Sequence, residues 1–249
     1  MKITANIITL NEEANIEACI RSVQQVCDEV LVVDSLSSDR TVEIAESLGA
    51  KVVAQAYLGD GPQKAFGAPL ASYDWVLSLD ADERLDGDAV AVIKALDLNA
   101  TSYEAFSFAR KTFVGEHLIR QWYPDRVARL YDRRRCGFST AGGHARVETE
   151  NVAALDAHLL HYSYPDYSAM IKTTYKFITR GARLAHEEGK RASKFDPLTH
   201  GLGALFKALI LKKGLFYGVH DWHVAVISAY SSYMKYVVMR DLQEREERA

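Results

Sequence analysis

Residues 76–85, VLSLDADERL, are an apolar run that ends abruptly in the carboxylates of Asp80, Asp82 and Glu83. A continuous apolar run of this kind is typical of a parallel strand that is buried on both faces. Three carboxylates packed so closely repel one another unless positive charge is bound among them. The stretch therefore predicts a buried strand with a cation site at its end.

The residues around this stretch alternate between strand-like and helical patterns. Strands are expected at 3–9, 30–34, 51–54 and 75–79, with helical spacing between them at 14–26, 39–48 and 62–70. Repeated strand–helix–strand units predict an α/β fold with a mostly parallel sheet and helices on both faces. Because such crossovers are right-handed, the carboxyl ends of the strands meet at one edge, where ligands bind.

Polar residues follow three of these strands. They are Thr9 to Glu12 after the first, Asp34 after the second, and Asp80 to Asp82 after the fourth. An Asp-X-Asp pair suits a hard divalent cation with oxygen ligands. Each end alone is also compatible with a solvated turn or a helix cap, but three on one edge favour a binding site.

Composition limits the function classes. The chain has 249 residues and a net charge of -3, which does not suit a general polyanion binder or a nucleic-acid partner. Residues 1–109 carry 7 basic and 18 acidic side chains, whereas residues 110–146 carry 9 basic and 3 acidic ones. The acidic part suits a cation, and the basic part suits an anion.

The cysteines and the terminal segments predict a cytoplasmic location. Three cysteines match no zinc or redox spacing, and an odd count fits a reducing compartment. The start of the chain runs directly into a strand and has no targeting pattern, and no apolar run is long enough for a transmembrane helix.

Four stretches resemble the family 2 glycosyltransferases of the GT-A fold. They are IITLNEEANIEACIRSV, EVLVVDSLSSDRTVEIAESLGAKVV, GDGPQKAFGAPLASYDWVLSLDADE and WYPDRVARLYDRRRCGFS. The last two are similar to bacterial lipopolysaccharide core glycosyltransferases, including the β-1,4-glucosyltransferases that act on inner-core heptose. The resemblance covers residues 1–164 approximately. It implies an inverting, metal-dependent transfer of a hexose, with UDP-glucose as the default donor, to a lipopolysaccharide core or related glycan.

The resemblance also implies a nucleotide-sugar site at the acidic edge. The residues that would line it are Thr9, Leu10, Asn11, Glu12, Asp34, Gln63, Lys64, Asp80 and Ala81. Asp34 would contact the base, and Asp80 the ribose or the metal. Asp82, with Asp80, would hold Mg²⁺ or Mn²⁺, which would bridge the diphosphate. One departure from the family is Asp34-Ser35-Leu36-Ser37, where many relatives have Asp-Asp-Gly-Ser.

The catalytic base has two candidates. Asp125 lies in a predicted loop, Trp122 to Asp125, where aromatic faces suit sugar rings and a carboxylate suits deprotonation of a hydroxyl. It is equally compatible with a turn residue paired with Arg126 or Arg129. His144 is the second candidate. Relatives often have His-Glu here, but this chain has His144-Ala145.

The second half of the chain predicts an acceptor region and a helical tail. We expect a GT-A domain at 1–165, with a nucleotide-sugar half at 1–109 and an acceptor half at 110–165, and a helical region at 166–249. Strands are expected at 105–109 and 127–131, and helices at 168–188, 202–212 and 224–240. His161 suits a diphosphate or metal contact, or a core position.

Two surfaces of this half have open interpretations. The arginines suit a phosphorylated glycan or a solvated strand edge; they are Arg126, Arg129, Arg133, Arg134 and Arg135. The apolar, lysine-bearing segments 202–213 and 216–239 suit peripheral contact with the inner face of the cytoplasmic membrane, a cover for the core, or a homo-oligomer interface.

Two other functions compete. A nucleotidyltransferase would carry a Gly-rich, basic phosphate loop near the N-terminus, where this chain has Leu10-Asn11-Glu12-Glu13. A non-catalytic sugar-nucleotide or glycan-binding protein of the GT-A fold is compatible with the missing His-Glu pair. Turnover with an acceptor separates it from an enzyme.

Overall fold

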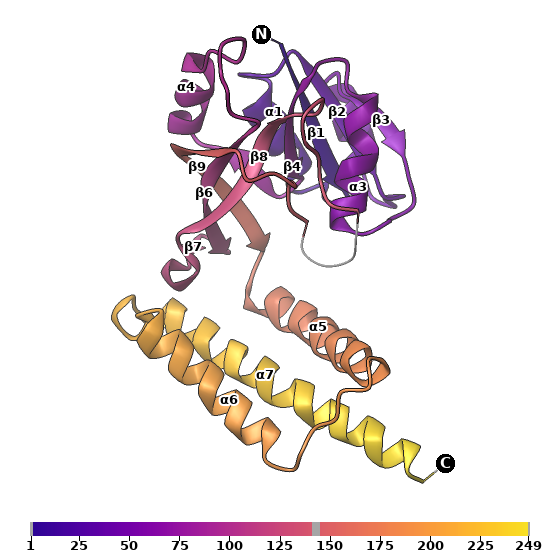
Figure 1. Ribbon diagram of the computed structural model, residues 1–249, viewed down its shortest axis with the longest axis vertical. Helices are drawn as coiled ribbons and strands as arrows, with labels where there is room; N and C mark the ends of the chain where they lie inside the picture. The colour runs from indigo at the N-terminus through magenta and orange to yellow at the C-terminus, as the bar shows by residue number, and fades with distance from the viewer. Residues whose placement is uncertain (1, 141–144, 249) are drawn as a thin grey trace. The chain divides into compact units, whose positions relative to one another are not determined.

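The computed structural model describes residues 2–140 and 145–248 (Figure 1). The chain divides into two compact units. Unit 1 contains Met1–Lys111 and Pro124–His161, and unit 2 contains Thr112–Tyr123 and Tyr162–Ala249. Two long strands, β6 and β9, continue from one unit into the other along the chain.

Unit 1 is built on a mixed sheet with the strand order β3-β2-β1-β4-β8-β6-β9-β5 in the described part of the chain. Its strands are β1 (Ile3–Thr9), β2 (Glu29–Asp34), β3 (Lys51–Ala54), β4 (Trp75–Asp80), β5 (Glu83–Leu85), β6 (Ala105–Val114), β8 (Asp125–Asp132) and β9 (Val152–Tyr164). The first four strands pair in parallel, whereas β8 pairs antiparallel with β4 and with β6. The predicted α/β class is confirmed, with the parallel arrangement confined to β1–β4.

The first three helices of unit 1 follow the expected order, and a fourth is added to them. They are α1 (Ile16–Val23), α2 (Thr41–Ser47), α3 (Asp60–Gly67), a 3-10 turn at Ala68–Leu70 and α4 (Gly87–Ala95). Helix α1 buries Ile16, Cys19, Ile20 and Val23, the apolar face that its spacing predicts. The first strand is buried along its whole length.

Alternation along β4 separates two apolar cores. Trp75, Leu77 and Leu79 belong to the main core, which includes α1 and α4. Val76 points the other way and belongs to a smaller core with Tyr131. This alternation follows from the two-residue period of a strand.

Among the longer elements and strands that begin in unit 1, three were absent from the expectations. The strand β5 has only three residues, α4 has a low amphipathic contrast, and β9 has thirteen residues with an irregular burial pattern. Asp125, expected in a loop, is the first residue of β8. It pairs with Arg110 of β6, and this pairing extends the strand beyond its apolar part.

Unit 2 is mainly helical. Its long helices are α5 (Tyr167–Glu187), α6 (Asp196–Phe206) and α7 (Val219–Glu246), and it also contains the short strand β7 (His117–Leu118) and a 3-10 turn at Arg120–Trp122. Figure 1 shows α6 and α7 as an extended helical hairpin. The segment 112–123 joins this unit because Val114 and Ile119 are buried with Met170 and Val224.

None of the helices in the described residues combines the length and the apolar character that crossing a membrane requires.

Gly67 provides a test of the packing between α3 and β1. A Cβ at Gly67 would overlap the buried side chain of Asn6, whose Nδ2 donates to Lys64 O at 2.9 Å. We expect Gly67→Ala to lower the free energy of unfolding by about 2 kcal/mol, because Asn6 must leave this position. Urea unfolding measures the change. Gly87→Ala is the matched control, since a Cβ there meets nothing within 4 Å; an equal loss in both variants would contradict the packing argument.

Candidate active site

The carboxyl ends of β1, β2 and β4 lie side by side. Thr9 pairs with Asp34, and Ile8 pairs with Asp80. The chain proceeds from β1 to β2 and β3 on one side, whereas β4 pairs on the other side of β1. In open α/β sheets, ligands bind in the crevice outside such a reversal of strand order. The acidic edge of the sheet therefore lies at this position.

The loops after β1 and β2 are joined by hydrogen bonds. Asp34 is buried, and its side chain accepts bonds from the backbone N–H and the hydroxyl of Ser37. The Ser37 hydroxyl in turn accepts from Asn11 N at 2.8 Å, and Asn11 Oδ1 accepts from Ser38 N at 2.8 Å. These bonds fix Asn11 and Asp34 in one small polar frame.

Leu36 stands at the third position of the Asp34-Ser35-Leu36-Ser37 segment, where many relatives have glycine. Its φ is 67°, in the left-handed region that glycine enters freely and leucine rarely does. Leu36 therefore has a backbone conformation that favours glycine, and its side chain is exposed. Strain of this kind is common at functional loops.

Gln63 and Lys64 come from α3 and are both buried. Gln63 Nε2 donates to Ser35 Oγ at 3.1 Å and to Gln55 O at 3.0 Å, so it ties together the loops after β2 and β3. Lys64 Nζ lies 2.7 Å from Asp80 Oδ1. Burial and the nearby Arg129 lower the pKa of Lys64, and Asp80 and Glu83 oppose them.

Glu83 is the centre of the site. It is fully buried, and it forms ion pairs with Arg129 at 2.8 Å and with Arg110 at 3.2 Å. Arg129 also binds Asp80 Oδ2 at 3.1 Å. Burial raises the pKa of Glu83, but Arg129 and Lys64 outweigh it, so the pKa of this carboxyl is held well below its usual range.

Asp125 is joined to the same network through Arg110. Arg110 Nε donates to Asp125 Oδ2 at 3.0 Å, and its Nη2 contacts the same oxygen. The side chain of Asp125 is 42% exposed. Asp125 is therefore a fixed carboxylate with one edge open to solvent, and its partner is Arg110 instead of the two arginines considered from the sequence.

Asp82 has a different partner. His161 Nε2 lies 3.2 Å from Asp82 Oδ2, and the Asp82 side chain is 20% exposed. Burial lowers the pKa of His161, but the hydrogen bond to Asp82 and the charges of Asp82 and Glu83 raise it overall. One carboxylate oxygen and one imidazole nitrogen thus converge beside the network.

Glu12 reports the negative charge of this edge. Its side chain accepts from Asn15 Nδ2 at 2.7 Å. Burial, which is the largest cause, and the charges of Asp82, Asp39 and Asp80 raise the pKa of Glu12. The negative charges of the carboxylates after β4 therefore act on Glu12, which lies in the loop after β1.

The structure brings some predicted site residues together and separates others. Glu12, Lys64, Asp80 and Asp82 converge, whereas Asn11 and Asp34 form the neighbouring loop frame. Thr9, Gln63 and Ala81 are buried, and Leu10 is exposed. His144 lies outside the described residues.

Glu83, Arg110 and Arg129 were missed as site residues. Glu83 belongs to the DADE motif, but the motif alone does not show which of its carboxylates points into the core. Arg110 and Arg129 come from β6 and β8 and meet Glu83 through tertiary packing.

A second group of possible metal ligands lies at the other end of β5. Asp86, Asp88 and His158 each offer a ligand atom, and these atoms lie within 4.8 Å of one another. Asp86 also caps α4, because its side chain accepts from Ala89 N at 2.8 Å. This capping role accounts for Asp86 without a metal.

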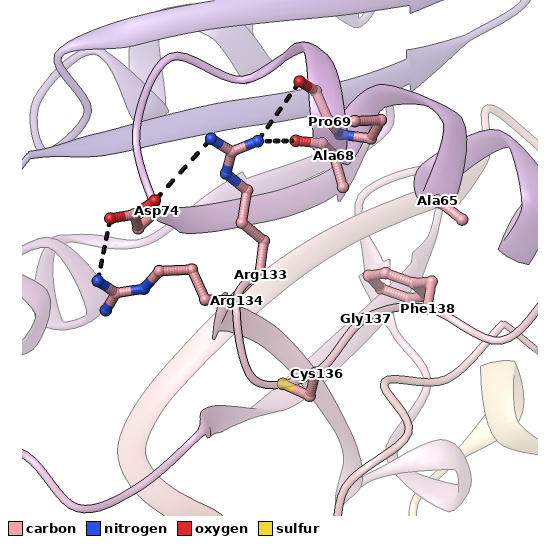
Figure 2. Close-up of a pocket in the computed structure, with 9 residues that line it drawn as sticks. All are labelled: Ala65, Ala68, Pro69, Asp74, Arg133, Arg134, Cys136, Gly137 and Phe138. Carbon is pink, nitrogen blue, oxygen red and sulfur yellow. Dashed lines mark hydrogen bonds and ion pairs between the residues drawn. The ribbon is translucent and has the colours of Figure 1, made fainter.

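The basic segment after β8 lines a shallow cavity of about 320 Å³ (Figure 2). Arg133 contacts the carbonyls of Ala68 and Pro69, and both Arg133 and Arg134 pair with Asp74. Arg135 pairs with Glu104, and Arg126 donates to Leu155 O. The five arginines are thus bound to acceptors of the chain itself, which favours the structural interpretation of this basic cluster.

The fold is an α/β sheet with acidic side chains at a reversal of strand order, which is a common place for ligand binding in this class of fold. The chain belongs to glycosyl transferase family 2, whose model matches residues 4–147. It is a glycosyltransferase, and the expected GT-A class with a helical C-terminal part is confirmed.

Relatives of the chain carry similar names. An uncharacterized glycosyltransferase of Rickettsia bellii is 29% identical over 97% of this chain and 87% of its own length. The lipopolysaccharide core biosynthesis glycosyltransferase LpsC of Rhizobium meliloti is 28% identical over 87% of this chain and 83% of its own.

A solved structure with a local likeness is glucosyl-3-phosphoglycerate synthase of Mycobacterium tuberculosis in complex with Mn²⁺, UDP and glucosyl-3-phosphoglycerate. The TM-score is 0.36 at 27% identity, and the match covers 46% of this chain and 44% of that one.

Glu83→Gln tests the buried network. The variant leaves Arg110 and Arg129 with a neutral partner in a buried position, and we expect the free energy of unfolding to fall by about 3–5 kcal/mol. Chemical denaturation followed by circular dichroism measures it. Glu46→Gln, at an exposed position of α2, is the control and should change stability by less than about 0.5 kcal/mol. A small effect of Glu83→Gln on the free energy of unfolding would contradict a central role of this ion-pair network in stability.

Proposed function

We propose that the protein transfers a hexosyl group from a nucleoside diphosphate sugar, UDP-glucose by default, to a lipopolysaccharide core or related glycan. Membership in family 2 supports the reaction class, and the name of the Rhizobium meliloti relative supports the acceptor class. The observation that carries the proposal is the position of Asp80 and Asp82 beside the carboxyl ends of β1 and β2, at the reversal of strand order. Because this acceptor would be a glycan linked to a lipid, the protein would act at the inner face of the cytoplasmic membrane.

Asp82 and His161 fit a divalent cation better than Asp80 does. Both oxygens of Asp80 already have cationic partners, Lys64 and Arg129, whereas Asp82 faces an imidazole. Mixed oxygen and nitrogen donors suit Mn²⁺ more than Mg²⁺, which prefers oxygen ligands alone. We therefore assign Asp82 and His161 to the metal, and Asp80 to the ribose or to a water bound at the metal.

Each group has a part in the transfer. Asp82 and His161 would hold a divalent cation, which would act as a Lewis acid and stabilise the charge on the departing diphosphate. Asn11 and Asp34 hold the nucleoside, in a frame that is already formed by their mutual bonds through Ser37. Asp125, held by Arg110, accepts the proton of the attacking hydroxyl. A single displacement of this kind inverts the anomeric carbon and requires no covalent enzyme intermediate.

Removal of the metal should abolish turnover, and the loss of the Asp82 carboxylate should lower it strongly. We expect hydrolysis of one donor from a UDP-sugar panel, faster with Mn²⁺ than with Mg²⁺ and lost in EDTA. Asp82→Asn should reduce the rate roughly a hundredfold, because a group that stabilises the transition-state charge is lost. Released UDP is the readout.

Asp88→Asn is the matched control, since Asp88 belongs to the other acidic group. A normal rate in Asp82→Asn with a loss in Asp88→Asn would move the metal to the Asp86, Asp88 and His158 group. A normal rate in both variants and in EDTA would exclude the metal from the mechanism.

Asp125→Asn should reduce kcat for transfer by roughly 10²- to 10⁴-fold and leave the Kd of the donor nearly unchanged, because the amide cannot accept the proton. Steady-state transfer and calorimetric donor titration measure the two quantities. Asp156→Asn, at an exposed position of β9, is the control. Equal effects on kcat and on donor binding would make Asp125 a structural partner of Arg110 instead of the base.

A further inference from the structure

The hairpin of α6 and α7 ends in an exposed apolar tip, residues 206–222. A π turn at Lys207–Leu211 and a 3-10 turn at Gly214–Phe216 connect the helices (Figure 1). The exposed large side chains of the tip are Phe206, Ile210, Leu211, Leu215, Phe216, Val219 and Trp222. Phe216 is 78% exposed and Leu211 65%. Contiguous apolar surface of this kind marks an interaction site.

The tip is a built structure. Trp222 Nε1 donates to Leu215 O at 3.1 Å, and Gly214 packs so closely on Ala208 that a Cβ would lie 2.7 Å from its carbonyl oxygen. The start of α7 is fixed because Gln121 N donates to the buried Asp221 carboxylate at 2.8 Å. The apolar side chains are therefore exposed by a defined backbone.

Helix α6 has the reverse of the usual amphipathic arrangement. Its small or rigid residues Pro197 and Gly201 are buried, and a Cβ on Gly201 would lie 3.0 Å from the Cβ of Tyr233 on α7. Leu198, Leu202 and Phe206, spaced four residues apart, are exposed. A helix that faces water buries its large apolar side chains and exposes its polar ones. This helix instead presents the apolar stripe outward, continuous with the tip.

The exposed charged side chains of the tip have one sign. Lys207, Lys212 and Lys213 are exposed, and the sequence has no acidic residue between Pro197 and His220. The next acid, Asp221, is buried against Gln121. Lysines beside apolar side chains can place their stems along the apolar layer and their ammonium groups among anionic headgroups.

We propose that residues 206–222 dock on the surface of an anionic bilayer, with Leu211 and Phe216 inserted and Lys207 and Lys212 at the headgroups. The lysines favour an anionic lipid surface over a second copy of this tip, which would bring like charges together. The docking rests on the proposed function and deepens it, because a lipid-linked acceptor lies at such a surface, but the vesicle-binding measurement itself uses neither donor nor acceptor.

Vesicle sedimentation of the full chain tests the docking. We expect binding to vesicles of phosphatidylcholine with about 30% phosphatidylglycerol, weaker binding to phosphatidylcholine alone, and a decrease with salt. Leu211→Ser with Phe216→Ser should weaken the binding about tenfold or more. Lys207→Gln with Lys212→Gln should weaken it to a similar extent on anionic vesicles only.

Matched controls keep the test specific to the tip. Phe177→Ser with Leu184→Ser removes two exposed apolar side chains of α5, and Lys51→Gln with Lys94→Gln removes two exposed lysines of unit 1. Both controls should bind vesicles like the wild type. Equal losses in the controls, or no vesicle binding by the wild type, would overturn the proposal.

Light scattering of the wild type gives a further discriminating result. A dimer that the Leu211→Ser, Phe216→Ser variant dissociates would assign the tip to a second copy and overturn the bilayer proposal. Donor hydrolysis without acceptor should be the same in the tip variants and the wild type. If no donor is hydrolysed but vesicle binding is lost in the tip variants, the proposed function fails and the docking stands.

Discussion

A carboxylate buried between two arginines is the constraint on which the candidate site depends. Glu83 has no solvent exposure and pairs with Arg110 and Arg129. A buried charge without a partner is far less stable than a paired one, so the packing of β5, β6 and β8 that brings these side chains together is favoured over packings that separate them. The same arginines then extend to Asp80 and Asp125. The interaction that stabilises the fold thereby also fixes the spacing between the donor side and the proposed base.

The first half of the fold was predictable because its signals are local. Buried parallel strands have apolar runs, and those of β1, β2 and β4 predict the observed bounds to within one residue. The edge that collects Thr9, Asp34 and Asp80 follows from right-handed crossovers alone. The strand β5 was missed because three residues are too few to show a periodic pattern. The helix α4 was missed because its apolar and polar residues are not clearly separated on two faces.

The site was only partly predictable for a different reason. The DADE sequence announces a charged site, but its sequence does not distinguish the inward carboxylate, Glu83, from the half-exposed Asp80 and Asp82. Burial sorts the three, and burial depends on β8 and β9, which arrive much later in the chain. Gln63 is a different case. Its side chain was expected to contact a ligand, but its amide nitrogen donates to Ser35 and Gln55 of the chain itself.

The pairing of Asp80 bears on how a metal and the network can coexist. Lys64 and Arg129 each bind one oxygen of Asp80. A divalent cation bound directly to Asp80 would lie beside both of these positive charges, which are buried and would repel it. A cation at Asp82 would instead lie beside an imidazole, which can give up its proton and bind the metal. The charge balance of the network therefore favours a division of labour in the Asp-X-Asp pair, with Asp80 neutralised within the fold and Asp82 available to the ligand.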